Sequence, residues 1–318
     1  GFSYRHFLML YNFFHNTSIF CIWLSAIAVF IVPLLILKKG INRLLAMAFV
    51  CIILSAVILL GGRAGLLGFL AASIFVYWKA NLPAYLTKKP VFFAFLAAAF
   101  LLFLYVSKPG SSSGRLHIYS ISLQILKDNW LTGIGIGKFK AAFNEYQAAY
   151  FMQHDIDNKR ALLADNTFYA FNDYLQWVAE TGIGGFILMA CFGILLIKRT
   201  SCLLKHHQNN PMLKGAVAAL ISLSVSAFFS YPLQVLPIQL TALACLGIIL
   251  FFPSRLVAAN RAAQILTVGL RCLYFPISLF FLYHCICSLQ TKSRESKAFQ
   301  FSMTGKKRDA LELYKKLA

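Results

Sequence analysis

The sequence contains very few acidic residues, and their distribution is uneven. Only 10 of the 318 residues are Asp or Glu, and residues 1–106 and 182–290 contain none of them. Coupled transporters commonly hold acidic relays inside the membrane, so this absence weighs against that class of protein. The net charge of +20 does not indicate nucleic-acid binding either, because the basic residues form short clusters between apolar runs.

The usual patterns for disulfides, metal ions and nucleotides are also absent. The eight cysteines all lie outside the polar segment 107–181, and we interpret them as small hydrophobic side chains. The sequence HCIC at 284–287 has no second ligand pair at zinc-site spacing, so no metal site is expected. The glycine-rich stretch WLTGIGIGKF at 130–139 has Phe139 where a P-loop needs Ser or Thr, and no cofactor is predicted.

Long apolar runs dominate the remainder of the chain. Apolar residues make up 59% of the sequence and charged residues 13%, about half the charged share of a soluble domain. The fold class that we expect is all-α: a polytopic transmembrane bundle of about eight helices with a long helical external loop. The expected spans are 18–37, 44–60, 65–78, 91–106, 182–197, 212–231, 237–252 and 272–289.

Polarity divides the chain into four segments. Membrane helices are expected at 1–106 and 182–290, an external, periplasmic cap at 107–181, and a polar helical tail at 291–318. The tail resembles the start of a tetratricopeptide repeat, so either further repeats lie outside this sequence or the tail is a surface helical hairpin. The chain begins with Gly1 and has no signal-peptide pattern, which indicates an N-terminal truncation.

Basic clusters alternate along the connectors and predict the topology. Clusters near Lys38, Lys88, Lys205 and Arg261 mark every second connector, and the positive-inside rule places these in the cytoplasm. The segment 107–181 and both termini are then expected on the other side of the membrane.

The external segment shows internal order. An apolar stripe at helical spacing follows Arg115 and ends near Trp130, which predicts a helix. In the glycine-rich stretch 130–139, the glycines permit positive φ and close backbone approach. A second helix is expected to begin near Asn172 and Asp173, either of which is a good N-cap, and to run directly into the next span.

Two arginines are candidates for chemistry. Arg63 lies in GGRAG between two apolar spans, where it either has a function or extends to headgroups and backbone carbonyls. Arg115 lies in SGRLHIY and is either a solvated surface residue or a functional one. Two guanidinium groups on one side of the membrane suit an anionic diphosphate, because each can bind phosphate oxygens in a bidentate manner.

Four stretches resemble a known family in their order and spacing. They are FHNTSIFCIWLSAIAVFIVPL, GGRAGLLGFLAASIFVYW, SGRLHIYSISLQILKDNWLTGIGIGKF and FNDYLQWVAETGIGGFILM. Together they are similar to the successive signatures of the O-antigen ligase and O-antigen polymerase superfamily, over most of residues 12–200. That resemblance implies a glycosyltransferase of the bacterial inner membrane, with a polyprenyl-diphosphate-linked glycan as donor and a lipid, saccharide or protein as acceptor. It also implies that Arg63 and Arg115 contact the donor diphosphate.

The chain departs from the family at one important position. Ligases of this family usually carry histidine directly before the asparagine of the fourth stretch, in an HNDYL-type motif, and this chain has Phe171 before Asn172. Phenylalanine cannot transfer a proton. Either another group serves as base, or this member carries out different chemistry, such as polymerisation.

Several residues near this motif are candidates for the missing role. Asp165 and Asp173 are the candidate bases, although Asp165 is alternatively a turn residue and Asp173 a helix cap. The candidates for binding or positioning the acceptor are Asn172, Tyr174, Glu180 and His154, the last of which is alternatively a surface histidine. Aromatic side chains that could stack on a sugar ring are Phe168, Tyr169, Phe171 and Tyr174.

Two other functions stay open at this point: a transporter or channel, and a non-catalytic scaffold that binds lipid-linked glycan. A glycosyltransferase needs Arg63 and Arg115 to converge on one site, whereas a transporter does not. The sequence alone does not decide this point.

Overall fold

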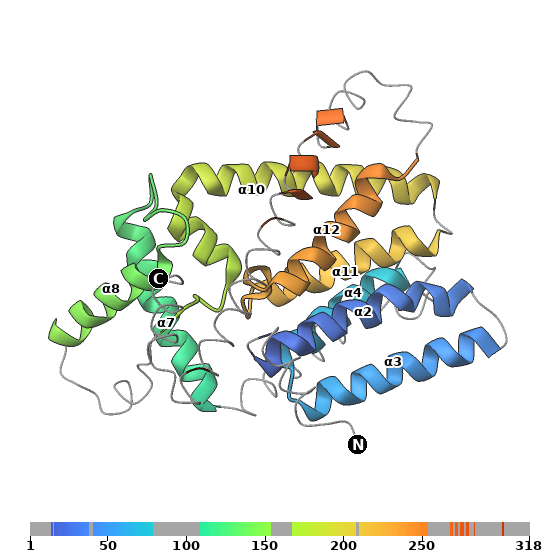
Figure 1. Ribbon diagram of the computed structural model, residues 1–318, viewed down its shortest axis with the longest axis horizontal. Coiled ribbons are helices and arrows are strands. Elements are labelled where there is room, and N and C mark those ends of the chain that lie inside the picture. Colours follow the sequence, from blue (N-terminus) through green and yellow to red (C-terminus); the bar gives the residue numbers. More distant parts are fainter. Residues whose placement is uncertain are drawn as a thin grey trace, which may run out of the picture. The chain divides into compact units, whose positions relative to one another are not determined.

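The computed structural model describes most of the chain, and every regular element in the described residues is a helix (Figure 1). The prediction of an all-α fold is therefore confirmed. The described residues are 14, 16–37, 41–78, 109–153, 167–207, 210–253 and short pieces between 268 and 301. The chain divides into two compact units, Gly1–Phe252 and Pro253–Ala318. The residues discussed below belong to the first unit.

Six apolar helices lie where spans were expected. They are α2 (Thr17–Leu37), α3 (Ile41–Leu59), α4 (Arg63–Trp78), α10 (Asp173–His206), α11 (Pro211–Ala227) and α12 (Leu236–Phe251). By length and composition, α2 and α10 can each cross a membrane, and the other four are shorter apolar helices. The expected span 91–106 lies outside the described residues, as does nearly all of the tail 291–318. Within 272–289 the described residues are helical.

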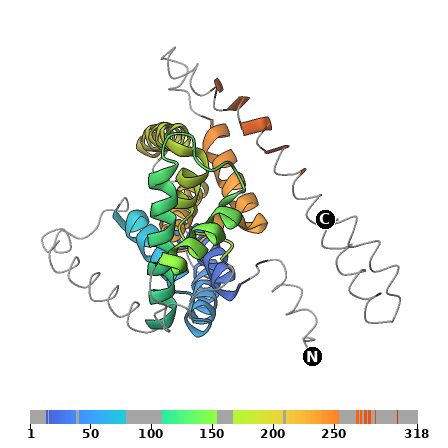
Figure 2. The same ribbon diagram turned by 90° about the vertical axis from the view of Figure 1, so that its left-hand side faces the viewer.

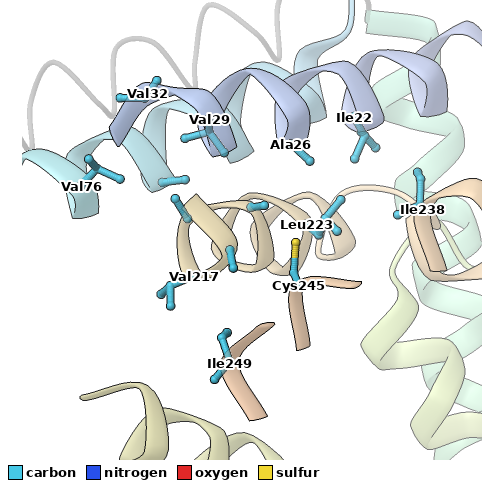
Figure 3. Packing of buried hydrophobic residues seen from close by; sticks show 14 of the residues in the cluster. Ile22, Ala26, Val29, Val32, Val76, Val217, Leu223, Ile238, Cys245 and Ile249 are labelled. Carbon is cyan, nitrogen blue, oxygen red and sulfur yellow. The ribbon is translucent and has the colours of Figure 1, made fainter. Parts of the chain in front are cut away.

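The core of the first unit forms around α2, which packs against α3, α4 and α11. On α2, Ile22, Ala26 and Val29 recur at helical spacing and are fully buried, and Figure 3 shows them facing Leu223 of α11. Small residues bring the backbones close together: a Cβ on Gly68 of α4 would lie 2.4 Å from the carbonyl oxygen of Ser222 on α11. Such contacts between small residues are typical of helix packing in membranes.

The segment 107–181 contains two helices, α7 (Pro109–Asp128) and α8 (Phe139–Gln153), which pack against each other through Ile121, Ile125, Phe139 and Phe143. Figures 1 and 2 show α7 running across the ends of the bundle helices. At the same end, the 3₁₀ helix η1 (Pro232–Gln234) connects α11 to α12. This end of the bundle carries the candidate site.

Helix α10 consists of two parts that meet at Gly182, whose φ of 65° is not helical. Figure 1 shows the sharp change of direction. Beyond Gly182, apolar side chains such as Leu188 and Ile197 are 70% and 65% exposed. In water this surface would be a large apolar patch, but in a bilayer it contacts lipid tails. The chain is therefore a polytopic membrane protein.

Candidate functional site

Arg63 is the first residue of α4, and the turn before it is packed tightly against α2. A Cβ on Gly62 would lie only 2.2 Å from the Cβ of Cys21, so this position requires glycine. The next carbonyl, that of Ala64, accepts a hydrogen bond from the Ser226 hydroxyl of α11 at 3.0 Å. The start of α4 is thus fixed to two neighbouring helices, and Arg63 itself is partly buried.

Arg115 projects from α7 into the same region. Its Nη1 donates a hydrogen bond to the carbonyl of Phe229 at 2.8 Å. Burial lowers the pKa of Arg115, the positive charge of Arg63 lowers it further, and Tyr119 opposes both effects. Both arginines lie near the end of α11, because Arg115 binds the Phe229 carbonyl and Ala64, next to Arg63, binds Ser226.

Phe171 lies directly against Arg115, with the guanidinium carbon 5.2 Å from the ring centroid. Its φ of 53° is the only positive value at a non-glycine position in the described residues, and this conformation costs about 1–2 kcal/mol. The Tyr119 hydroxyl donates to the Phe171 carbonyl at 3.0 Å, and the Tyr231 ring meets the Phe171 ring edge-on at 5.2 Å. Contacts from α7 and from the connector between α11 and α12 therefore hold this residue in place.

Helix α10 begins at the predicted place. Asn172 is its N-cap, because its side-chain oxygen accepts a hydrogen bond from the backbone N–H of Leu175 at 3.0 Å. The alternative that Asp173 is the cap is therefore wrong. Asn and Asp are almost equally good caps, so the residue types alone could not decide between them.

Asp173 instead binds the connector between α11 and α12. It is 4% exposed, and its Oδ2 accepts a hydrogen bond from the backbone N–H of Leu233 at 2.8 Å. Burial raises the pKa of Asp173 to about 7, against the opposing effects of the Leu233 N–H and the Gln234 side chain. This carboxyl group can therefore gain or lose a proton near neutral pH.

The aromatic residues expected to contact sugar mostly contact the protein. Tyr174 donates from its hydroxyl to the Ser224 carbonyl at 2.9 Å, and Tyr169 stacks on Tyr231 with the ring centroids 4.2 Å apart. Phe168 is 51% exposed, and Lys140 lies 3.8 Å above its ring. Of the four, Phe168 presents the most open side chain.

Glu180 is buried within a hydrogen-bond network. Its Oε2 accepts from the backbone N–H of Gly137 at 2.8 Å, and its Oε1 accepts from Nε2 of Gln176 at 3.1 Å. Gln176 in turn accepts from the backbone N–H of Ala170 at 3.1 Å. Glu180 thus joins the glycine-rich stretch 130–139 to α10 and to the loop that carries Phe171.

The glycines of that stretch behave as expected. Gly133, Gly135 and Gly137 all have positive φ. A Cβ on Gly133 would lie 2.4 Å from the Glu180 carbonyl oxygen, and one on Gly182 would lie 2.5 Å from the Leu131 carbonyl oxygen. The expectation of positive φ and close backbone approach is confirmed, and the partner in that approach is the kink of α10.

The structure brings Arg63, Arg115, Asn172, Asp173 and Tyr174 to one end of the first unit. The candidates His154 and Asp165 lie outside the described residues. Tyr231 was not among the predicted site residues, yet it contacts both Tyr169 and Phe171. One sequence feature could have identified it: Tyr231 lies beside Pro232, in a connector expected on the same side of the membrane as both arginines.

A search of curated proteins found no match to this chain. The family model described as O-antigen ligase matches residues 7–190, which is more than half of the 318 residues. The matched region includes both arginines, the glycine-rich stretch and the start of α10. The chain therefore belongs to the O-antigen ligase family, the membrane glycosyltransferases of ligase and polymerase type.

Proposed function

We propose that this protein transfers a glycan from a polyprenyl-diphosphate carrier to a lipid, saccharide or protein acceptor, and that Arg63 and Arg115 bind the donor diphosphate. The observation that carries this proposal is that both arginines lie at the end of α11: Arg115 binds the Phe229 carbonyl, and Ala64, next to Arg63, binds the Ser226 hydroxyl. A diphosphate offsets their mutual repulsion, and each guanidinium fork matches a pair of phosphate oxygens.

The reaction needs charge stabilisation more than a strong nucleophile. The acceptor hydroxyl oxygen attacks the anomeric carbon, the bond from that carbon to the phosphate oxygen breaks, and the lipid diphosphate leaves with the bonding electrons. Negative charge grows on the diphosphate as the bond breaks, and two fixed cations stabilise it. The protein's main tasks are then to orient the acceptor and to hold the arginines in place.

The proton of the acceptor hydroxyl requires a base other than Phe171. Among the described carboxyl groups, Asp173 suits this role best, because burial raises its pKa to about 7, and a base is most effective near the working pH. Asp165, outside the described residues, is the other proposed base, and His154 is a proposed residue of the acceptor side. In this proposal Asn172, Tyr174 and Glu180 act indirectly, by fixing the start of α10 and the glycine-rich stretch.

We also propose that the site faces the periplasm from the bacterial inner membrane. The basic residues Lys198, Lys205 and Lys214 lie near the end of α10 and the start of α11, whereas the arginine pair lies near the end of α11, where Ser226 binds Ala64. The positive-inside rule then places the arginine pair on the external side, where diphosphate-linked glycans are used by this family.

The test is replacement of each arginine by lysine, which keeps the charge but loses the fork. Full-length protein in detergent is incubated with a polyprenyl-diphosphate glycan and acceptors, and the released lipid diphosphate is measured. We expect Arg63→Lys and Arg115→Lys to lower turnover roughly ten- to hundredfold, the loss typical of a hydrogen bond to a charged group.

The matched control is Arg43→Lys, at an exposed position of α3, which is expected to leave turnover unchanged. Near-normal transfer by both site variants would remove the basis for the diphosphate site. Donor binding by the wild type without any release would instead identify a non-catalytic scaffold.

A further inference from the structure

We propose that Phe171 is a positioning residue: its ring holds the Arg115 guanidinium in the orientation that receives the donor diphosphate. This inference rests on the proposed function and assigns a role to the residue that stands where ligases of the family carry histidine. In this role the side chain at position 171 acts through Arg115 and transfers no proton.

The guanidinium group of Arg115 is constrained in two ways. The Phe171 ring lies against it with the guanidinium carbon 5.2 Å from the centroid, within the range of a cation–π contact. The carbonyl of Phe229 accepts a hydrogen bond from Nη1 at 2.8 Å. One contact restricts the tilt of the planar group and the other restricts its rotation. The carbonyl uses one of the five N–H donors of the fork, and the others serve to bind phosphate oxygens.

The Phe171 ring is itself held by neighbouring groups. Tyr119, one turn after Arg115 on α7, donates its hydroxyl to the Phe171 carbonyl at 3.0 Å. Tyr231 meets the Phe171 ring at 5.2 Å with the ring planes 83° apart, and Tyr231 is in turn stacked on Tyr169 at an interplanar angle of 18°. Tyr119 of α7 thus fixes the backbone of Phe171, and Tyr231 of the connector between α11 and α12, itself stacked on Tyr169, fixes the ring.

The backbone at Phe171 supports a functional role. Its φ of 53° is unfavourable for a bulky side chain, and Asn or Gly would adopt it more easily. Residues in such conformations persist where the surrounding structure determines them, and they cluster at binding and catalytic sites. At Phe171 the strained backbone directs the aromatic ring onto Arg115.

The benefit of this arrangement is preorganisation. A mobile arginine loses side-chain freedom when it binds a ligand, and that loss weakens binding. Arg115 is already restrained, so a diphosphate meets a guanidinium group that is close to its bound orientation. Because the contact depends on the face of the ring, an aromatic residue at position 171 should support donor binding and an aliphatic residue should not.

The first test measures affinity for a simple prenyl diphosphate. Farnesyl diphosphate is titrated into the full chain in detergent, using the wild type, Phe171→Leu and Phe171→Tyr. We expect Phe171→Leu to weaken binding roughly two- to tenfold, the effect of ordering one long side chain on binding, and Phe171→Tyr to retain it. The control Phe186→Leu removes a ring from the apolar part of α10, where Phe186 is 47% exposed, and should bind like wild type. Wild-type affinity in Phe171→Leu would overturn the proposal.

A second variant separates the effect of the aromatic ring from the effect of the backbone conformation at position 171. Phe171→Asn places a residue that tolerates the left-handed conformation at φ 53°, so the fold should be retained, with a melting temperature at or above that of wild type. We expect its diphosphate affinity to be as weak as that of Phe171→Leu. If Phe171→Asn binds like wild type, the ring has no part in binding and the proposal is wrong.

A double-mutant cycle with Arg115→Gln distinguishes this proposal from the proposed function. If Phe171 acts through Arg115, Phe171→Leu should weaken binding in the wild type and have no further effect in Arg115→Gln. Additive losses would mean that Phe171 acts independently, which would overturn the positioning role while leaving the arginine site intact. Unchanged affinity in Arg115→Gln alone would instead contradict the diphosphate site of the proposed function.

Discussion

The two parts of α10 differ in which side chains they bury: polar ones are buried before Gly182, and apolar ones are exposed after it. Before Gly182, the polar residues Asp173, Gln176 and Glu180 are buried, and their side chains accept hydrogen bonds from backbone N–H groups of neighbouring loops. After Gly182, apolar residues such as Leu188 are exposed. The first part follows the ordinary rule for a protein interior, in which most buried polar atoms are paired, as Oδ2 of Asp173 and both carboxylate oxygens of Glu180 are. The second part follows the rule for a lipid-facing surface.

This difference shows where the membrane-spanning part begins and why the site lies beside that point. The kink at Gly182 directs the polar turns of α10 over the end of the bundle, where Asp173 reaches the connector between α11 and α12. Without the kink, the same polar residues would continue along the axis of the span. We therefore expect substitutions at the kink to have the largest effect on stability, and substitutions on the lipid-facing part of α10 to have the smallest.

Gly182→Ala should disrupt the kink between the two parts of α10. The φ of Gly182 is 65°, and a Cβ there would lie 2.5 Å from the Leu131 carbonyl oxygen and 2.7 Å from the Gly133 nitrogen. These are backbone atoms that cannot move aside easily, so we expect a loss of stability of roughly 2–4 kcal/mol, measured as a lower melting temperature in detergent, together with reduced turnover.

The chain offers a matched control for this substitution two residues further along. A Cβ on Gly184 would meet no atom within 4 Å, and alanine is the better helix former. Gly184→Ala should therefore leave stability unchanged or raise it slightly. Equal behaviour of the two variants would show that the kink does not depend on glycine at position 182.

Asp173→Asn tests the buried polar part of α10. The pKa of Asp173 is raised by burial from 3.8 to about 7, so between these values the folded protein binds a proton that the unfolded chain has released. Stability should then fall as pH rises through this window, by roughly 1.4 kcal/mol per pH unit, and level off above pH 7. The asparagine variant keeps an acceptor for the Leu233 N–H and should lose this pH dependence.

The measurement is thermal unfolding of both proteins at several pH values between 4 and 8. Asp128→Asn provides the control, since Asp128 is an exposed carboxylate at the end of α7. It should retain the wild-type pH dependence. A slope that persists unchanged in Asp173→Asn would assign it to another group.

The sequence was sufficient to predict what depends on local pattern. Apolar runs predicted the helices, alternating glycines predicted the positive φ of Gly133 and Gly135, and a cap followed by an apolar run predicted the start of α10. These features depend on residues close together in the chain. Arg63 and Arg115 became candidates through their positions beside apolar spans, and the resemblance to the family then predicted that they contact the donor diphosphate.

The sequence could not predict contacts between distant segments. The ring contact of Phe171 with Arg115 and the hydrogen bond of Asp173 to Leu233 depend on how α7, α10 and the connector after α11 pack. From the sequence, Phe171 was notable only because it stands where the family usually carries histidine. Its contact with Arg115 could be seen only in the structure. Its φ of 53° is likewise set by tertiary contacts, since nothing in the residue type favours it.

The smallest effect is expected on the lipid-facing part of α10. Leu188 is 70% exposed, and lipid tails are as apolar as the leucine side chain, so Leu188→Ala should change stability by no more than about 0.5 kcal/mol. The buried counterpart is Ile22→Ala, at a position with no exposure, where the cavity left behind should cost about 2–5 kcal/mol.

A third variant, Leu188→Lys, distinguishes lipid from water as the neighbour of this surface. In water the lysine is harmless, whereas near the centre of a bilayer it costs about 2.5–3.5 kcal/mol. Thermal unfolding in lipid nanodiscs gives the three values on one scale, and a Leu188→Lys variant as stable as wild type would show that this part of α10 does not face the hydrocarbon core.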